Sequence, residues 1–456
     1  MTATCEFGRY DDPTLVSGGE LLILSEAGGA IGLQTTSRPV FSNTNFLLNR
    51  AFYNHVFQKE EGEFLRLGDI FRITKNESLR GPVNRNFSLL GDPMMTLAYP
   101  EYEVNITDLN GSSLNAEGDT ISALGLTRFS GVIVDQANVQ QNSFNGVLSI
   151  KAFDIPNEVA TLGNESSPTI FEERSNLIFK GDVTIENGAF DFEFVVPRNI
   201  SYLFQEGKIS LYAQSDDGVD ANGANIDLRI GGTDPNAPDD STPPQLELFL
   251  NTESFRSGDE TGPNPLLIAH VSDENGINIS NTGIGQSITA TLDGNTNFNL
   301  NEFYSANIDS YQEGTIRYPL SNLEEGEHQL TLRLFDTHNN PTERTINFFV
   351  SKDAKNAIFN VTNYPNPLRD RTTISFSHNR LGENLDLTVE IYDLRGDLVK
   401  TLNTQLFDST GTIDQLSWDR TNSRGSRVKT GIYISRIILK TTEGVSTAHQ
   451  KLIVIN

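Results

Sequence analysis

A two-residue alternation of apolar and polar side chains dominates the sequence from Tyr102 to the C-terminus. Leu148–Phe153 and Phe190–Val195 are typical of these short runs, and clusters of Gly, Asn, Asp and Pro separate them. A period of two places alternate side chains on one face of a strand, while the intervening residues favour turns. The pattern therefore predicts a series of β-sandwiches over most of the chain.

Residues 1–100 follow a different pattern, in which helical and extended segments alternate. Ser17 and Glu20 have the spacing of a capping box, which predicts a short helix that continues to Leu24. Ala30–Thr36 is apolar at its start and predicts a buried strand. With the Cys5 segment as a first strand before this helix, the order is strand, helix and strand. This order favours a mostly parallel sheet covered on both faces, which is an α/β arrangement.

Two further helices are expected in this first part. One begins near Ser42 or Asn43, and the other, a shorter helix, surrounds Leu65–Thr74. The helix near Ser42 carries one apolar stripe, formed by Leu48, Phe52, Tyr53, Val56 and Phe57. We expect the α/β part to end near Pro100.

At 456 residues, the chain is long enough for three or four domains. Residues 231–244 contain four prolines and no large apolar side chain, which predicts a linker. We therefore expect a multidomain protein, with an α/β part followed by all-β Ig-like sandwiches. The expected domains are 1–100 for the α/β part, 101–232 for a first β-sandwich, 233–244 for a Pro/Asp-rich linker, 245–354 for an Ig-like sandwich and 355–456 for a C-terminal Ig-like domain.

The chain is strongly acidic, with 60 acidic and 34 basic residues and a net charge of −26. This charge repels phosphate backbones and argues against nucleic acid as a partner. No apolar run approaches the ~18–20 residues of a membrane helix, and no signal peptide is visible. The single cysteine, Cys5, allows no intrachain disulfide, so cysteine usage leaves the compartment open.

Cys5 ends a short threonine-rich run, and Gly, Asp and Pro residues follow it. Cysteine proteases of the caspase-like type need a thiolate at the end of a sheet strand, beside a histidine that takes the proton of the thiol. The residue types around Cys5 fit that position. Taken alone, they favour a buried, small apolar side chain, and the nucleophile is the alternative.

Four segments of the first hundred residues resemble, in the right order, the end of the gingipain-like cysteine peptidase domain. They are Thr2–Arg9, Gly28–Leu33 with Thr35–Arg38 after it, Asn49–Tyr53 and Leu89–Pro93. The resemblance implies a partial caspase-like α/β fold for residues 1–100. It also implies that Cys5 is the catalytic nucleophile.

The resemblance places the family's partner histidine upstream of the cysteine, whereas only Met1–Thr4 precede Cys5 here. His55 falls on the second expected helix, where its position suits a helix surface rather than a catalytic base. We therefore expect a truncated peptidase domain that holds the nucleophile without its base and is inactive alone.

The other histidines and the carboxylate runs lead us to expect no metal and no cofactor. The histidines lack i, i+3 or i, i+4 pairing and cysteine companions, so we interpret them as surface or strand residues: His270, His328, His338, His378 and His449. Some carboxylates offer oxygen ligands for Ca²⁺ without the spacing of an EF-hand, and we interpret them as solvated loops: Asp234, Asp239, Asp240 and Asp273–Gly276.

The last hundred residues resemble the flagellar-hook-cap-like Ig domain that serves as a type IX sorting domain. The resemblance rests on Asn363–Pro367, Val389–Gly396, Trp418–Arg420 and Arg424–Tyr433. We expect Trp418 to anchor the core, and Gly425 and Gly431 to permit turns. The usual Trp-Asp-Gly-x-Asp pattern is Trp-Asp-Arg-Thr-Asn here, which leaves the turn type at Arg420 open.

Together the resemblances, which include segments of the middle of the chain, imply a sortase of the type IX secretion system. Such a sortase is a cysteine endopeptidase and transpeptidase that removes the C-terminal sorting domains of secreted cargo proteins and attaches the cargo to anionic lipopolysaccharide. The resemblance further implies a cell-surface location, peripheral on the outer membrane, and binding to the outer-membrane barrel PorV within an attachment complex. The alternative is a non-catalytic adhesion or scaffold protein with Ig-like modules and an inert Cys5.

Overall fold

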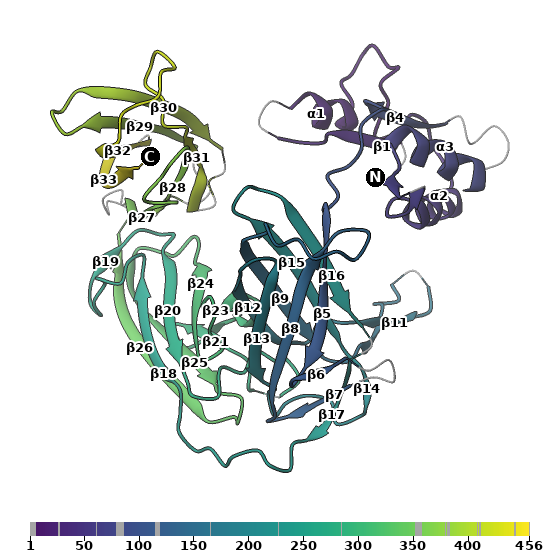
Figure 1. Ribbon diagram of the computed structural model, residues 1–456, viewed down its shortest axis with the longest axis horizontal. Coiled ribbons are helices and arrows are strands. Elements are labelled where there is room, and N and C mark those ends of the chain that lie inside the picture. Colours follow the sequence, from purple (N-terminus) through teal and green to yellow (C-terminus); the bar gives the residue numbers. More distant parts are fainter. Residues whose placement is uncertain are drawn as a thin grey trace. The chain divides into compact units, whose positions relative to one another are not determined.

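The chain folds as a mainly β, multidomain protein with a small α/β start (Figure 1). It forms two compact units, Met1–Glu101 and Tyr102–Asn456, and the finer domain boundaries stay a prediction. No helix in the part described is long and apolar enough to cross a membrane. The computed structural model describes residues 6–25, 28–60, 62–78, 86–114, 119–164, 166–226, 228–283, 285–351, 358–378, 380, 384–407, 409, 412–441 and 444–455.

The first unit begins with a helix whose start follows the predicted capping box. The Glu20 amide donates to Ser17 Oγ (3.3 Å), and the Ser17 amide donates to the Glu20 carboxylate (2.8 Å). This cap and the start of the second helix at Ser42 are confirmed. The elements of the unit are α1 (Gly18–Leu24), β1 (Gly32–Thr36), α2 (Ser42–His55), β2 (Lys59–Glu60), β3 (Glu63–Phe64), α3 (Leu67–Ser78) and β4 (Phe87–Gly91).

Strand β1 pairs with β4 in antiparallel register, from Gly32 opposite Gly91 to Thr36 opposite Phe87. The expectation of a mostly parallel sheet is therefore wrong for the described part of this unit. An apolar run indicates that a strand is buried, but it does not encode the direction of the neighbouring strand. Here the chain passes through α2 and α3, and β4 then runs back along β1.

The core of the first unit is small. Leu48 of α2 and Phe87 of β4 form a buried cluster, and Val40 and Phe71 pack against it. Many other large apolar side chains of the unit lie on its surface, including Leu21, Leu24, Ile31, Phe41, Phe46, Tyr53 and Phe57. The predicted stripe on α2 is thus wrong in part, because its members Tyr53 and Phe57 are exposed while Leu48 and Val56 are buried.

A first β-sandwich follows. Its larger sheet has the order β13-β8-β5-β16-β15-β9-β12, and β14, β17 and β7 form a smaller sheet. The predicted alternation is confirmed in β13, where Phe190, Phe192 and Phe194 are buried and Phe129 stacks on Phe192 at 4.8 Å. The strands are β5 (Tyr102–Leu109), β6 (Ser112–Ser113), β7 (Thr120–Ala123), β8 (Leu126–Val134), β9 (Gly146–Phe153), β10 (Asn157–Ala160), β11 (Ile170–Glu173), β12 (Leu177–Ile185), β13 (Ala189–Val195), β14 (Gln205–Glu206), β15 (Lys208–Ser215), β16 (Asp220–Asn225) and β17 (Arg229–Thr233).

A second sandwich is built from two sheets of strands between Gln245 and Val350. One sheet has the order β19-β26-β25-β21-β22, and β23, β24, β20 and β18 lie side by side in the other. A 3₁₀ helix, Asn301–Phe303, precedes β23. The strands are β18 (Gln245–Leu250), β19 (Glu260–Thr261), β20 (Leu266–Ser272), β21 (Thr289–Leu292), β22 (Thr296–Asn299), β23 (Tyr304–Ala306), β24 (Glu313–Pro319), β25 (Gly326–Phe335) and β26 (Pro341–Val350).

The two sandwiches share one sheet and one core. Strand β12 pairs in parallel with β23 through Gly181 opposite Ala306, which joins their sheets into a 12-stranded sheet. Buried apolar side chains form one cluster that extends from Val104 to Val350. The Asp309 carboxylate strengthens the junction by accepting hydrogen bonds from the amide (2.7 Å) and hydroxyl (2.6 Å) of Thr184.

The C-terminal region forms a third sandwich with its own core. Its sheets have the orders β27-β28-β31 and β30-β29-β32-β33. Trp418 is fully buried, donates from Nε1 to the Thr421 carbonyl (2.9 Å) and packs against Tyr433, so its predicted role as a core anchor is confirmed. The strands are β27 (Ile358–Tyr364), β28 (Thr372–His378), β29 (Leu385–Asp393), β30 (Leu398–Leu406), β31 (Thr412–Trp418), β32 (Gly431–Thr441) and β33 (Gly444–Val454).

Arg420 stands where the usual sorting-domain pattern has glycine, and its backbone is left-handed, with a φ of 58°. A residue with a Cβ is strained in that conformation. The side chain offsets part of the strain, because Nε donates to the Val428 carbonyl (3.2 Å) and Nη1 to the Arg369 carbonyl (2.8 Å). The turn is thus retained without glycine. Gly425, with a φ of 76°, supplies the next turn as predicted.

Candidate active-site edge and acidic cluster

The predicted nucleophile, Cys5, lies outside the described residues, so its catalytic role stays a prediction. The chain that follows it is held at the carboxyl end of β1, where the Gly8 amide donates to the Thr36 carbonyl (2.9 Å). Gly8 also fits closely against Thr35, because a Cβ at this position would lie 2.1 Å from Thr35 Cγ2. The peptide that leaves Cys5 therefore runs beside the end of a buried strand.

Two arginines hold the loop after Cys5. Arg38 donates to Asp11 (2.6 Å), and Arg9 lies 3.3 Å from Glu6 and 3.2 Å from Asp12. The hydrogen bond from Arg38 lowers the pKa of the Asp11 carboxyl below its ordinary value. The described part of this loop thus carries three carboxylates and two guanidinium groups, a charge balance that does not favour a thiolate.

His55, the nearest candidate base in sequence, ends α2. Its Nε2 lies 2.7 Å from the Glu77 carboxylate of α3, and the side chain is largely covered. The pair links the two helices of the first unit. His55 therefore has a structural partner of its own, which agrees with its interpretation as a helix residue rather than a catalytic base.

Four of the five remaining histidines lie in strands, as expected: His270 in β20, His328 in β25, His378 in β28 and His449 in β33. The expectation is wrong for His338, which is buried in the turn between β25 and β26. Its Nε2 donates to the Pro238 carbonyl (3.1 Å), and its Nδ1 lies 3.8 Å from Asp240. The histidine therefore connects this turn to residues of the predicted linker.

His378 and Ser409 form a buried pair in the C-terminal sandwich, with His378 Nε2 2.7 Å from Ser409 Oγ. The Arg380 amide donates to His378 Nδ1 (3.1 Å), so the proton of the neutral ring lies on Nε2. Burial lowers the pKa of His378 to about 4. Because the nitrogen that faces the serine already carries a proton, this pair does not act as a nucleophile and its base.

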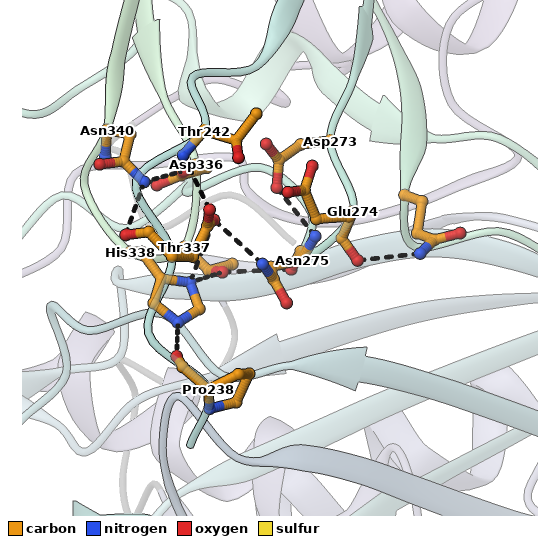
Figure 2. Close-up of polar contacts among 11 residues, drawn as sticks. Pro238, Thr242, Asp273, Glu274, Asn275, Asp336, Thr337, His338 and Asn340 are labelled. Carbon is orange, nitrogen blue, oxygen red and sulfur yellow. Dashed lines mark hydrogen bonds and ion pairs between the residues drawn. The ribbon is translucent and has the colours of Figure 1, made fainter.

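The structure brings three carboxylates from distant parts of the chain together, two of which, Asp273 and Asp336, are labelled in Figure 2. Asp240, Asp273 and Asp336 each offer an oxygen, and these oxygens lie within 4.8 Å of one another. The interpretation of Asp240 and Asp273 as solvated loop residues is wrong, because Asp273 is buried and the Asp240 side chain is only 6% exposed. Asp239 stays exposed, as expected.

Sequence reasoning did not single out Asp336. Asp336 is the first residue after the predicted strand His328–Phe335. Asp273 likewise lies close to a strand end, two residues after the predicted strand Leu266–Val271. The position of each acid at the end of a strand was therefore readable. Their proximity was not, because it depends on how β20 and β25 are arranged in facing sheets and on where the linker passes.

Two family models match the ends of the chain. Residues 1–98 match the model of peptidase family C25, and residues 362–455 match the model of a secretion system C-terminal sorting domain. The fold agrees with this division, since an α/β start leads into β-sandwiches. The chain is thus similar to a C25 peptidase at its start and to a secretion system sorting domain at its end, and such sorting domains belong to proteins secreted to the outer membrane or cell surface.

Among solved structures, dimeric latent PorU from Porphyromonas gingivalis is 29% identical to this chain, with 88% of this chain covered and a TM-score of 0.40. The chain spans about 39% of the length of that PorU chain. Escherichia coli alpha-2-macroglobulin is 9% identical over 77% of this chain and 25% of its own (TM-score 0.18). The FN1-FN3 domains of chicken CNTN1 are 8% identical over 78% of this chain and 99% of their own (TM-score 0.18). No curated protein matches the sequence.

Proposed function

We propose that this protein is a PorU-like sortase of the type IX secretion system. It acts as a cysteine endopeptidase and transpeptidase that removes the C-terminal sorting domains of cargo proteins and joins the cargo to anionic lipopolysaccharide. The observation that supports this most is the 29% identity to PorU, which extends over 88% of the chain and includes both the C25 region and the sorting domain.

In this proposal Cys5 is the nucleophile. A histidine elsewhere in the complete peptidase domain takes the thiol proton, and the thiolate attacks the carbonyl carbon of the scissile peptide bond. The C–N bond then breaks, the sorting domain leaves as an amine that takes up that proton, and the cargo stays as a thioester on Cys5. An amine of the surface glycan, or water, attacks the thioester and releases the thiol.

The surface of the first unit supports the proposal that further peptidase-domain strands pack against it. Its buried cluster contains Leu48 and Phe87, whereas Ile31 beside β1 and Phe46 of α2 are exposed. Apolar side chains of this size are normally buried against another layer of the same domain. We propose that these further strands of the peptidase domain carry the catalytic histidine, and that residues 1–456 alone are inactive.

The proposed location is the cell surface, peripheral on the outer membrane. The proposed partners are cargo proteins with sorting domains, anionic lipopolysaccharide, and the outer-membrane barrel PorV in an attachment complex. The C-terminal sandwich supports a docking role, because its outer strands β30 and β33 end their sheet. Other segments bond only part of each edge: the Leu368 amide donates to the Ile453 carbonyl of β33, and the Ser423 amide donates to the Val399 carbonyl of β30.

The test is cleavage of a cargo protein that carries a sorting domain, followed by intact-mass spectrometry. We expect cleavage by these 456 residues joined to a complete C25 peptidase domain, and a loss of roughly 10³-fold or more in the Cys5→Ala variant. The matched control, Asp239→Asn, changes an exposed residue and keeps full activity. Cleavage that persists in Cys5→Ala would contradict the proposal, as would cleavage by residues 1–456 alone.

A non-catalytic surface scaffold is the second candidate, and the large share of β-sandwich from Tyr102 onward favours it (Figure 1). On this alternative Cys5 is inert. The same experiment separates the two functions, because a scaffold predicts no cleavage even when the complete peptidase domain is present. Binding to the cargo or to the outer-membrane barrel would then survive in Cys5→Ala.

A further inference from the structure

Three segments of the β region converge on the acidic cluster formed by Asp240, Asp273 and Asp336. Asp240 belongs to the predicted linker, Asp273 follows β20, and Asp336 begins the turn between β25 and β26. Asp336 is fully buried and Asp273 is 6% exposed. Carboxylates are seldom buried to this extent unless a cation or a hydrogen-bond network compensates for their charge.

Backbone amides fix the orientation of all three carboxylates. Thr242 donates to Asp240, Asn275 to Asp273 and Asn340 to Asp336, each at 2.8 Å. The side-chain amides of Asn275 and Asn340 donate to Asp240 (3.0 Å) and to Asp336 (2.7 Å). The cluster is thus preorganised, with one oxygen of each carboxylate within 4.8 Å of the others.

One oxygen of the cluster has no partner among the described residues. Asp273 Oδ2 is buried and accepts no hydrogen bond, although Oδ1 of the same carboxylate does. A buried carboxylate oxygen of this kind is stable only with a proton or a cation beside it.

We propose that Asp240, Asp273 and Asp336 bind a divalent cation of the calcium type. Ca²⁺ prefers oxygen ligands at roughly 2.3–2.6 Å, so ligands on opposite sides of the ion lie about 4.6–5.2 Å apart. Oxygens that lie within 4.8 Å of one another fit such a set, and the near-ideal octahedral geometry that Mg²⁺ demands is harder for three fixed carboxylates to supply. The ligand set consists of the three carboxylates, and His338 beside them donates from Nε2 to the Pro238 carbonyl, with its Nδ1 3.8 Å from Asp240.

The position of the cluster indicates what the cation does. The turn that contains Asp336 also contacts the first sandwich, because the Arg198 amide donates to the Thr337 carbonyl (2.8 Å) and Asn339 donates to Asn199 (2.8 Å). A cation shared with Asp240 therefore ties the linker to the second sandwich at the place where the two sandwiches meet. We infer that it fixes the junction between them, which is independent of the proposed peptidase function.

The experiment is a calorimetric titration of CaCl₂ into the EDTA-treated, purified chain at pH 7.5, with thermal unfolding measured alongside. We expect one site with a Kd on the order of 10⁻⁴–10⁻³ M or tighter. Saturating Ca²⁺ should raise Tm by roughly 5–10 °C, since a ligand that binds only the folded state stabilises it. Asp273→Asn should lose both responses, whereas Asp239→Asn, the exposed neighbour with the same change of charge, should keep them.

Several outcomes would overturn the cation site. One is the absence of Ca²⁺ binding to the wild-type chain, and another is equal binding by Asp273→Asn. If circular dichroism shows that Asp273→Asn does not fold, the wild-type chain decides: a Tm that is the same in excess EDTA and in excess CaCl₂ contradicts the proposal, and a saturable rise supports it. A parallel MgCl₂ titration should give a weaker response; an equal one would refute the preference for calcium. None of these measurements depends on peptide cleavage.

Discussion

The α/β unit and the β-sandwiches differ in how completely they bury their own apolar side chains. In α2, Leu48 is buried while Phe46 and Tyr53 are exposed, so the helix is covered on one narrow face. In β9 the inward positions Leu148 and Ile150 are fully covered by the second layer of the same sandwich. The β region therefore buries its apolar side chains within its own sheets, whereas the α/β unit has a surface suited to packing against a further layer.

The largest expected effect comes from matched phenylalanine substitutions in the two regions. Phe129→Ala in the first sandwich should lower the free energy of unfolding by about 3–5 kcal/mol, because it leaves a cavity beside Phe192. Phe41→Ala in the α/β unit, where the ring is 74% exposed, should change it by less than about 0.5 kcal/mol. Urea unfolding followed by circular dichroism measures both. A loss of stability for Phe41→Ala as large as that for Phe129→Ala would contradict the stated difference in burial between the two regions.

The next effect is a pH dependence confined to the C-terminal sandwich. Burial lowers the pKa of His378 to about 4 in the folded state, below the ordinary value of 6.5. The contribution of the neutral His378 ring to the free energy of unfolding is therefore fully present above pH 6.5. It is lost as the pH falls from 6.5 towards 4, by up to about 3 kcal/mol. Thermal unfolding between pH 4 and 8 tests this. His378→Gln should flatten the profile, and His449→Gln, which removes an exposed histidine of the same sandwich, should not.

How far the sequence predicts this structure depends on whether a feature is local. The capping box at Ser17, the start of α2 at Ser42 and the alternation in β9 and β13 were predictable, because neighbouring residues determine them. The antiparallel pairing of β1 was not, since periodicity indicates a buried face and not the direction of a partner strand. The burial of α2 was overestimated for the same reason, because a stripe shows which face is apolar and not whether anything covers it.

The candidate sites divide in the same way. The role of Cys5 was inferred from a family resemblance and stays a prediction, because the residue lies outside the described part of the chain. The acidic cluster escaped prediction because Asp240, Asp273 and Asp336 are far apart in sequence and meet only through long-range packing. Trp418 was predictable, since the single large indole of a small β domain is expected in its core.

A smaller effect is expected from a substitution at the start of α1, in the α/β unit. Ser17→Ala removes the hydroxyl that accepts the Glu20 amide and should destabilise α1 by about 1 kcal/mol. Hydrogen exchange with mass spectrometry should detect faster exchange of the α1 amides, with no change in β9. Ser17→Thr keeps the hydroxyl and is the matched control. A change in the sandwich amides would show that the two units unfold together, against the comparison drawn above.

The smallest effect concerns the strained turn of the C-terminal sandwich. Arg420→Ala keeps the left-handed backbone and loses both side-chain hydrogen bonds, whereas Arg420→Gly loses the same bonds and relieves the strain. The glycine variant should therefore be the more stable of the two by about 1 kcal/mol. Thermal unfolding of the pair measures the difference. An alanine variant as stable as the glycine variant would show that the turn relaxes.

The pairing of β12 with β23 has a consequence for solubility. Separate sheets would leave four terminal strands with unsatisfied amides and carbonyls, whereas the joined sheet ends only at β13 and β18. Glycine at position 181 allows this close approach, because a Cβ there would lie only 3.1 Å from the Cβ of Ala306. Two strand edges that could otherwise pair with strands of other molecules thus face each other within the chain. This arrangement protects the protein against fibril-like aggregation.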